Sequence, residues 1–288
     1  MRPDSQAALT SLVEARFRNM IGLEVGGPSD LFRSGGLVPI YELAERVDNC
    51  NFQAGTVWSP AFVEGPTFNF AEGKKPGFQF IREAADLRSI GTSSYDFVCS
   101  SHTLEHCANP IRALREWARV LKADGHLFII LPHRDGTFDH RRPVTQMPHL
   151  VADDLNGADE HDLTHLPEIL ELHDLSMDPG GGTPDQFKRR SLENFGNRCL
   201  HQHVFDTALM VHLLDHCGFQ LLAVDQFLPF HIVAFARAPT PGSTPDNSAF
   251  MARRSSCYVE SPFPSDRPRL PRPLAWVSRL MGRPPAHT

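Results

Sequence analysis

Residues Tyr95–His133, YDFVCSSHTLEHCANPIRALREWARVLKADGHLFIILPH, decide the fold of this chain. Tyr95–Ser100 and His126–Leu131 are short apolar runs of the kind that form buried strands. A helix begins between them at Asn109-Pro110, because asparagine caps helices and proline suits the first turn. Apolar residues then recur every three or four positions, and Gly125 is a natural helix stop. Two buried strands joined by such a helix predict a right-handed βαβ unit in a parallel sheet.

The ends of these two strands predict where a ligand binds. In parallel sheets, ligands lie beyond the carboxyl ends of the strands. The first strand brings residues Ser100–His102 to that edge, and the second brings His133–Asp135. Both groups are therefore expected to border a candidate site.

Composition limits the classes of protein that this chain can belong to. Its 288 residues allow one large domain or two small ones, and 41% hydrophobic residues suffice for a core. The net charge of −6 gives no reason to expect nucleic acid as a partner. We expect no transmembrane segment, since no run of 18 apolar residues occurs, and the N-terminus lacks a signal-peptide core. Six scattered cysteines without a C-x-x-C pair favour reduced thiols and a cytoplasmic protein.

The residues before the central stretch predict the first strands of the sheet. An opening helix over Ser5–Asn19 leads to a strand at Ile21–Val25 and then to Gly26-Gly27-Pro28-Ser29-Asp30. Such glycines let the backbone approach a ligand closely, although a plain strand-to-helix turn is the alternative. A second strand is expected within Glu42–Asn49, ending near Asp48. An acid about 20 residues after a glycine turn is where ribose hydroxyls are held, unless Asp48 is a solvated loop acid.

The remaining segments complete the predicted organisation. Residues 50–77 are expected to form a folded loop, and Phe78–Ala84 a third strand that is followed by Asp86-Leu87. Residues 134–203 form a polar, His-rich insertion, a wall or lid over the site, with a helix at Leu166–Leu172.

The end of the chain divides into a folded part and a predicted tail. A helix over Val204–Cys217 and an antiparallel hairpin of Phe219–Phe227 and His231–Arg237 close the domain, which spans residues 1–238. The Pro- and Arg-rich tail 239–288 is predicted to be disordered. Its basic end, including a short amphipathic turn at Leu274–Met281, is a candidate surface for a protein partner.

The order of these signals resembles the class I S-adenosylmethionine-dependent methyltransferases. The resemblance is carried by GLEVGGPS, Asp48, AADL, YDFVCSSHTLEH, RVLKADG and LFIILP. It is closest to the type 11 branch, which methylates small molecules and includes ubiquinone and menaquinone biosynthetic enzymes. The resemblance implies a Rossmann-like, doubly wound α/β fold. Its mostly parallel seven-stranded sheet has an antiparallel last strand, and the His-rich insertion follows strand 5.

The resemblance also implies S-adenosylmethionine as cofactor and a set of residues that bind it. Loop residues after the first strand would line its methionine end, Asp48 would hold the ribose, and Asp86-Leu87 the adenine. Only the first of the family's three spaced glycines is in place. The full set of implied cofactor residues is Glu24, Gly26, Gly27, Asp48, Asp86, Leu87 and Ser101.

Methyl transfer needs little from the protein beyond alignment and removal of a proton. The sulfonium is already activated, so the protein brings an acceptor in line, and histidine is the usual base near neutral pH. His102 and His133 are the candidates, because both follow strand ends. The expected acceptor is a hydroxyl of a small molecule or glycan. The alternatives are a non-catalytic cofactor-binding module, which the incomplete glycine loop favours, and a metal-dependent hydrolase.

The segment His102-Thr103-Leu104-Glu105-His106 raises the question of a metal. As H-x-x-E-H it matches the inverted zinc-protease motif, but that motif needs a helix and here a buried strand precedes it. In ubiquinone-type O-methyltransferases the corresponding segment resembles a divalent-metal site, which would assign His102, Glu105 and His106 as ligands. The alternative is a hydrogen-bonded His106 packed beneath the cofactor loop.

Polar residues of the insertion allow a second site. These residues could bind a metal or a substrate, or they could satisfy the backbone of an irregular insertion. Arg141 and Arg142 could meet a substrate carboxylate or phosphate, or pair at the surface. The residues of the second candidate site are His161, Asp162, His165, His173, Asp174, His201 and His203.

Overall fold

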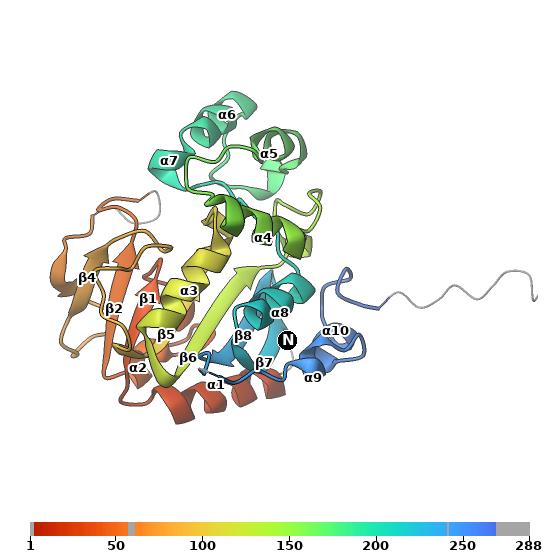
Figure 1. Ribbon diagram of the computed structural model, residues 1–288. Coiled ribbons are helices and arrows are strands. Elements are labelled where there is room, and N and C mark those ends of the chain that lie inside the picture. Colours follow the sequence, from red (N-terminus) through yellow and green to blue (C-terminus); the bar gives the residue numbers. More distant parts are fainter. Residues whose placement is uncertain (1–2, 57–60, 241, 269–288) are drawn as a thin grey trace, which may run out of the picture.

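The structure, a computed structural model, describes residues 3–56, 61–240 and 242–268. A central sheet carries helices on both faces (Figure 1). Its strands are β1 (Ile21–Val25), β2 (Arg46–Asn51), β3 (Gly65–Phe68), β4 (Gly77–Ile81), β5 (Tyr95–Ser101), β6 (Leu121–Pro132), β7 (Gln220–Phe227) and β8 (His231–Arg237). Its helices are α1 (Pro3–Phe17), α2 (Ile40–Leu43), α3 (Pro110–Val120), α4 (Met147–Asn156), α5 (Leu166–Leu172), α6 (Pro184–Leu192), α7 (Asn194–Asn197), α8 (Thr207–His216), α9 (Ser248–Met251) and α10 (Ser256–Val259).

The strand order is β3-β4-β2-β1-β5-β6-β8-β7. The five strands from β4 to β6 in this order are all parallel, and β8 runs antiparallel to both of its neighbours. The predicted Rossmann-like α/β fold with an antiparallel last strand is confirmed. The eighth strand is β3, an antiparallel edge strand within residues that were expected to form only a loop. Pro66 suits this position, because an edge strand tolerates a residue without an amide donor.

The central βαβ unit forms as its sequence predicts. The side chain of Asn109 accepts from the amide of Arg112 and caps α3, with Pro110 in the first turn. The helix ends at Val120, earlier than Gly125, because β6 begins directly at Leu121 and pairs with β5. The parallel β5–β6 pair sets the direction of the whole sheet.

Alternate side chains of the strands fill two separate cores. On β6, Leu127 and Ile129 belong to the core under α3 and α8. Phe128 and Ile130 belong to the core under α1 and α2 on the other face. This alternation is the period of two that a strand buried on both faces shows. The sheet is therefore a rigid support whose carboxyl edge is left for a site.

The second strand lies later in the sequence than predicted. Glu42 belongs to the short helix α2, and β2 continues through Cys50 to Asn51. The polar residues Asn49 and Asn51 thus lie inside the strand and not beyond it. Both are buried, and their amides bond to each other and to Gln79 of β4, so the sheet accommodates them.

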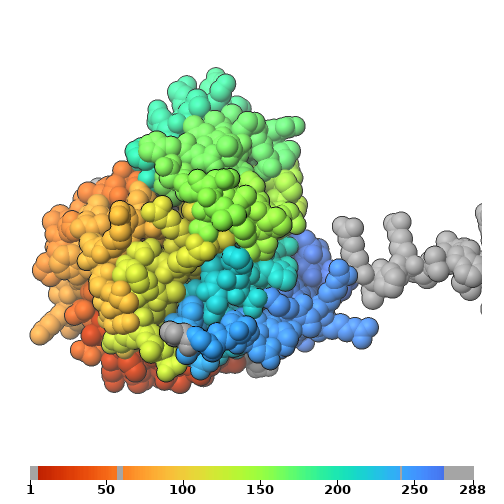
Figure 2. All heavy atoms as spheres, viewed as in Figure 1, coloured from red at the N-terminus to blue at the C-terminus, as the bar shows by residue number. Residues whose placement is uncertain are grey.

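The insertion between β6 and α8 has a small core of its own. Ile169, Phe187 and Leu200 form this core, which involves α5, α6 and the residues after α7, whereas Leu150 of α4 belongs to the core under α3 and α8. Figure 2 shows the insertion, coloured green, standing as a lobe on the sheet domain. The lobe rises from the carboxyl edge of the sheet (Figure 1).

The predicted disordered tail is ordered over much of its length. Residues 242–268 form α9 and α10 and bury Cys257, Tyr258 and Phe263. Asp266 accepts hydrogen bonds from the hydroxyls of Thr207 and Ser261. The prolines that suggested disorder separate short helices that pack on the sheet domain. The predicted turn at 274–281 lies outside the described residues. None of the helices in the described part of the chain has the length and apolarity that crossing a bilayer requires.

Candidate active site

A cavity of about 1110 Å³ lies between the carboxyl edge of the sheet and the insertion. The loops after β1, β2, β4 and β5 form its floor, as expected for ligand sites in parallel sheets. The insertion supplies the opposite wall, from Gly136 to His201. The insertion, predicted to be a wall or lid over the site, therefore borders this cavity. The floor residues are Gly26, Gly27, Pro28, Ser29, Asn51, Phe52, Glu83, Ala84, Ser101, His102 and Thr103.

The glycine loop after β1 comes so close to its neighbours that side chains are excluded. Gly26 has φ of +88°, and a Cβ there would lie 1.9 Å from Thr103 Oγ1. A Cβ on Gly27 would lie 2.1 Å from the carboxyl carbon of Glu24. The bare backbone at the cavity is a cradle that a ligand can approach closely. These residues fit the predicted cofactor loop.

Side chains of β2 hold this loop in place. The amide of Gly27 donates to Asn49 Oδ1 at 3.1 Å, and Nδ2 of Asn51 donates to the Gly27 carbonyl at 2.9 Å. Asn49 donates to the same carbonyl at 3.1 Å. The loop therefore has a fixed shape although it lacks two of the family's glycines.

Glu24 lies beneath the loop and does not line the cavity. The amide of Ser29 donates to its Oε1 at 3.0 Å, and the hydroxyl of Tyr41 donates to its Oε2 at 2.6 Å. Burial raises the pKa of Glu24 to about 8, against the opposing effect of these two hydrogen bonds. Glu24 therefore supports the loop from below, and the prediction that it lines the methionine end of a cofactor is corrected.

The two acids predicted to hold ribose and adenine lie away from the cavity. Asp48 is buried within β2, where it accepts from the Tyr95 hydroxyl and the Phe78 amide, each at 2.8 Å. Asp86 forms a bidentate pair with Arg88 outside the cavity. Leu87 is fully buried in the core. All three assignments are corrected because β2 ends at Asn51 and β4 ends at Ile81, not where the sequence pattern placed those ends.

The residues that occupy these strand ends in the structure are Asn51-Phe52 and Glu83-Ala84. Nη2 of Arg198, in the insertion, donates to Glu83 Oε1 at 2.6 Å. The same guanidinium lies 4.9 Å from the centre of the Phe52 ring. One arginine of the insertion thus contacts the ends of two strands.

The two predicted catalytic histidines have different surroundings. His102 lines the cavity, has φ of +51°, and places Nε2 3.0 Å from His231 Nδ1. A positive φ is uncommon for histidine and is often found where a side chain is aimed at a site. His133 is fully buried, and its Nε2 lies 3.2 Å from Asp266 Oδ1. Since His133 does not line the cavity, its assignment as catalytic base is corrected.

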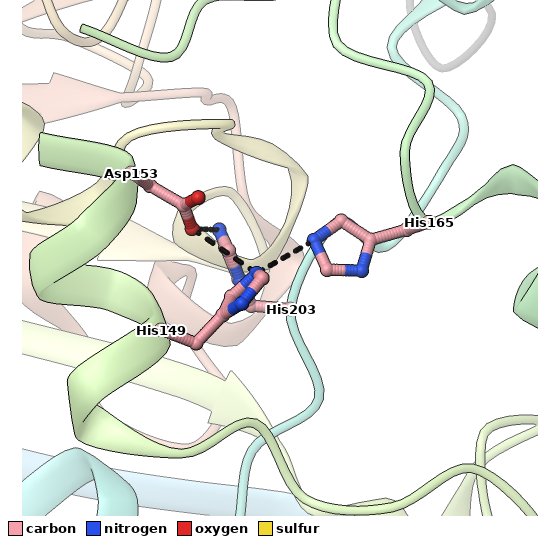
Figure 3. Close-up of side chains that lie close together, drawn as sticks. All are labelled: His149, Asp153, His165 and His203. Atoms are coloured by element: carbon pink, nitrogen blue, oxygen red, sulfur yellow. Dashed lines mark hydrogen bonds and ion pairs between the residues drawn. The ribbon is translucent and has the colours of Figure 1, made fainter. Parts of the chain in front are cut away.

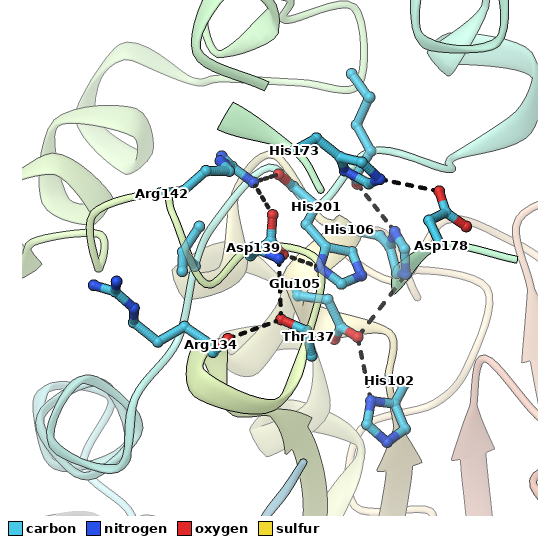
Figure 4. Close-up of polar contacts among 12 residues, drawn as sticks. His102, Glu105, His106, Arg134, Thr137, Asp139, Arg142, His173, Asp178 and His201 are labelled. Atoms are coloured by element: carbon cyan, nitrogen blue, oxygen red, sulfur yellow. Dashed lines mark hydrogen bonds and ion pairs between the residues drawn. The ribbon is translucent and has the colours of Figure 1, made fainter. Parts of the chain in front are cut away.

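Glu105, His106 and His201 form a cluster at the cavity with ligand atoms within 4.8 Å of one another (Figure 4). Asp139 Oδ2 lies 2.5 Å from His201 Nδ1, and the Leu200 carbonyl lies 3.0 Å from His106 Nδ1. Both rings are thus anchored through Nδ1. His106 Nε2 lies 3.9 Å from Glu105 Oε1.

The electrostatics of this cluster suit a cation. Both carboxylate oxygens of Glu105 are buried, and Oε1 has only the long contacts to His102 Nδ1 at 3.5 Å and His106 Nε2 at 3.9 Å in place of a well-formed hydrogen bond. Burial opposes ionisation of Glu105, but the neighbouring His102 and His106 outweigh it and lower its pKa. Burial and the nearby His201 lower the pKa of His106 to about 4, which keeps that imidazole neutral. A carboxylate and two imidazoles anchored through Nδ1 are a common donor set for a divalent metal.

This cluster differs from the predicted set in one ligand. Glu105 and His106 are brought together, but His201 joins them in place of His102, whose Nδ1 lies 3.5 Å from Glu105 Oε1. The sequence contained His201 as part of an H-x-H pair without indicating its partner. Asp139, which anchors His201, was not among the predicted site residues.

Other polar residues of the insertion pair within the protein. Arg142 is fully buried between Asp139 and Glu168 and cannot reach a substrate. The prediction that it meets a substrate carboxylate or phosphate is therefore corrected. Arg141 pairs with Asp174. The remaining predicted cluster residues are dispersed: His161 pairs with Asp159, His173 with Asp178, and Asp162 accepts from Thr164. His165 and His203 come together in a different group, with His149 and Asp153.

Comparisons with known proteins agree with the observed sheet. Residues 59–129, which include β5, α3 and most of β6, match the family model described as a methyltransferase domain. No curated protein matches the chain.

Similar solved structures include an S-adenosylmethionine-dependent methyltransferase from Mesorhizobium loti, with 13% identity and a TM-score of 0.47, covering 81% of this chain and 96% of that one. A putative methyltransferase from Bacillus halodurans has 13% identity and a TM-score of 0.45, covering 82% and 100%. The 1,6-didemethyltoxoflavin-N1-methyltransferase of Burkholderia thailandensis, with S-adenosylhomocysteine bound, has 14% identity and a TM-score of 0.43, covering 83% and 78%. Because these identities and TM-scores are low, the assignment to a methyltransferase fold rests on the family match and on the strand order.

Proposed function

Because residues 59–129 belong to the methyltransferase-domain family, we propose that the protein is an S-adenosylmethionine-dependent methyltransferase that acts on a hydroxyl of a small molecule or sugar. The observation that carries the proposal is the cavity at the carboxyl edge of the sheet. The bare glycine loop, the ends of β2 and β4, and a histidine with positive φ all open into it. Its volume exceeds the typical upper range for one ligand site, so a cofactor and a second small molecule fit together.

The residues that hold the cofactor are on the β1, β2 and β4 side of the cavity. The loop Gly26–Ser29 offers close backbone approach, and Asn51 fixes its shape. Glu83 is the acid at the end of β4 and replaces Asp86 as the residue that accepts hydrogen bonds from the cofactor. When bound, the cofactor supplies a methyl group on a sulfonium centre.

The acceptor side lies around His102, Phe138 and His231. His102 takes the proton from the acceptor hydroxyl through Nδ1, because its Nε2 faces His231, and the resulting imidazolium is stabilised by Glu105 Oε1 at 3.5 Å. His231 is held neutral, because burial and the neighbouring His102 lower its pKa to about 4. A neutral His231 can accept a hydrogen bond from His102 and so orient its ring.

Glu105, His106 and His201 hold a divalent metal in this proposal. Support comes from the two unsatisfied oxygens of the Glu105 carboxylate and from the anchored imidazoles. A cation there would polarise an acceptor hydroxyl and favour loss of its proton. Asp139 fixes the ring of His201 in the orientation that presents Nε2 to the cluster.

Calorimetry followed by a product assay tests the proposal. The full-length protein is titrated with S-adenosylmethionine and S-adenosylhomocysteine, and then incubated with hydroxyl-bearing small molecules and sugars while S-adenosylhomocysteine is quantified. We expect binding of both compounds, and turnover that EDTA reduces. Absence of binding would refute a cofactor site. Binding without turnover of any acceptor, with or without added Mg²⁺ or Zn²⁺, would favour a non-catalytic module.

A further inference from the structure

A second group of metal-type side chains lies outside the cavity. His149 and Asp153 come from α4, His165 precedes α5, and His203 belongs to the segment that leads back to α8 (Figure 3). Their ligand atoms all lie within 4.8 Å of one another, and none of the four lines the cavity. We propose that these four residues bind one zinc ion that joins α4, the start of α5 and the returning segment within the insertion.

The distances among the four side chains fit a small coordination sphere. His149 Nε2 lies 3.1 Å from His165 Nε2 and 3.3 Å from Asp153 Oδ2. His203 Nε2 lies 3.8 Å from the same Asp153 oxygen and donates to the Ala108 carbonyl at 3.3 Å, a hydrogen bond that zinc binding through this nitrogen would replace. Zinc–nitrogen bonds of about 2.0–2.1 Å in a tetrahedron place ligand atoms about 3.3 Å apart. Three imidazoles and one carboxylate are also a donor set that zinc prefers.

Protons alone satisfy this arrangement poorly. His149 Nε2 can carry a single proton, yet His165 Nε2 and Asp153 Oδ2 both face it at close range. Asp153 Oδ2 and His203 Nδ1 are buried without a hydrogen-bond partner among the described residues. A cation would satisfy the lone pairs of His149 Nε2, His165 Nε2 and Asp153 Oδ2, which one proton cannot.

The local structure places these residues where they are needed. His149 and Asp153 are four residues apart, so they share one face of α4. His203 is fixed from the other side, because its amide donates to the Glu105 carbonyl at 3.2 Å. Three segments that are distant in sequence thus meet at one point. None of the four residues lines the cavity, so zinc binding here can be tested without a methyl-transfer assay.

Zinc binding by the EDTA-stripped, full-length protein tests the proposal. The other metal cluster is first removed by Glu105→Gln. Native mass spectrometry and competition with a zinc chelator then count the ions and measure affinity. We expect the Glu105→Gln variant to keep one tight zinc ion. Adding His149→Ala should weaken zinc binding by more than the 10–100-fold that loss of an outer-shell partner costs. Zinc should raise Tm in the single variant and not in the double one.

His161→Ala on the same Glu105→Gln background is the matched control. His161 lies in the same insertion, its side chain is 69% exposed, and it is not in the group. It should leave zinc affinity and the zinc-induced change in Tm unchanged. Circular dichroism in EDTA checks that each variant is folded. If the His149→Ala protein is unfolded, Asp153→Asn replaces it as the variant that lacks a zinc ligand. Equal zinc affinity in the His149→Ala and His161→Ala proteins would overturn the proposal, as would a Glu105→Gln protein that binds no zinc.

Discussion

The Arg198 guanidinium donates a 2.6 Å hydrogen bond to the Glu83 carboxylate, joining the insertion to the end of β4. Arg198 also packs against Phe52 at the end of β2. The insertion is therefore tied to the strand ends where the cofactor is proposed to bind.

Glu83→Ala should weaken binding of S-adenosylmethionine, whereas Asp86→Ala should not. Glu83 lines the cavity, and hydrogen bonds to a charged group contribute roughly 1.5–3 kcal/mol, so Kd should rise about tenfold or more. Asp86 pairs with Arg88 outside the cavity and is the matched control. Calorimetry measures both values of Kd. A larger rise in Kd for Asp86→Ala than for Glu83→Ala would show that Asp86, and not Glu83, contacts the adenine.

Gly26→Ala should abolish cofactor binding while Gly35→Ala preserves it. Both glycines have positive φ, so alanine costs about 1–2 kcal/mol of strain at either position. At Gly26 the new Cβ would also meet Thr103, whereas at Gly35 no atom lies within 4 Å. Urea unfolding measures the free energy of unfolding of both variants, and the difference between them reports the contact with Thr103, since the backbone strain is common to both. Calorimetry gives the Kd for the cofactor. Similar cofactor affinity in the two variants would show that the loop does not form the cradle.

Glu24→Gln should remove part of the pH dependence of stability. Burial raises the pKa of Glu24 from 4.5 to about 8, so between these values the folded protein holds a proton that the unfolded chain has lost. This contribution is full below pH 4.5 and is lost as pH rises toward 8, with a slope of at most about 1.4 kcal/mol per pH unit. The free energy of unfolding of the variant, measured in urea from pH 5 to pH 8, should fall less steeply than that of the wild type. Parallel curves would mean that Glu24 is ionised in the fold.

His102→Ala and His133→Ala should affect different properties. Loss of a general base lowers kcat by about 10²–10⁴, so His102→Ala should impair turnover with little change in cofactor Kd. His133 is fully buried beside Asp266 and stacks on Phe263, so His133→Ala should lower Tm. Single-turnover kinetics and thermal unfolding distinguish the two effects. A normal kcat in folded His102→Ala protein would exclude His102 as the base.

The fold was predictable because its signals are local. The apolar spacing of α3 and the two apolar runs around it identify the βαβ unit without knowledge of any distant contact. The ends of the other strands were less accessible. Asn49 and Asn51 look like strand-ending residues until Gln79 and the Gly27 carbonyl are seen to satisfy them. The prediction of Asp48 as the ribose residue used only its spacing from the glycine turn, and β2 continues past it to Asn51.

The candidate site was predictable only where its residues are neighbours in sequence. Glu105 and His106 adjoin each other and were identified together, whereas His201 reaches them through the path of the insertion. The spacing of His149 and Asp153 on α4 was a readable signal that the prediction missed. Their partners His165 and His203 were noted but assigned to other residues, because the contacts depend on how three segments return to the sheet.

His201 and His203 are separated by one residue, yet each belongs to a different metal-type cluster. The same short backbone segment therefore carries one ligand of the proposed zinc site and one ligand of the proposed metal site at the cavity. Removal of the zinc ion would loosen this segment and displace His201. A chelator should therefore lower turnover in two ways, by removing the cavity metal and by disturbing one of its ligands.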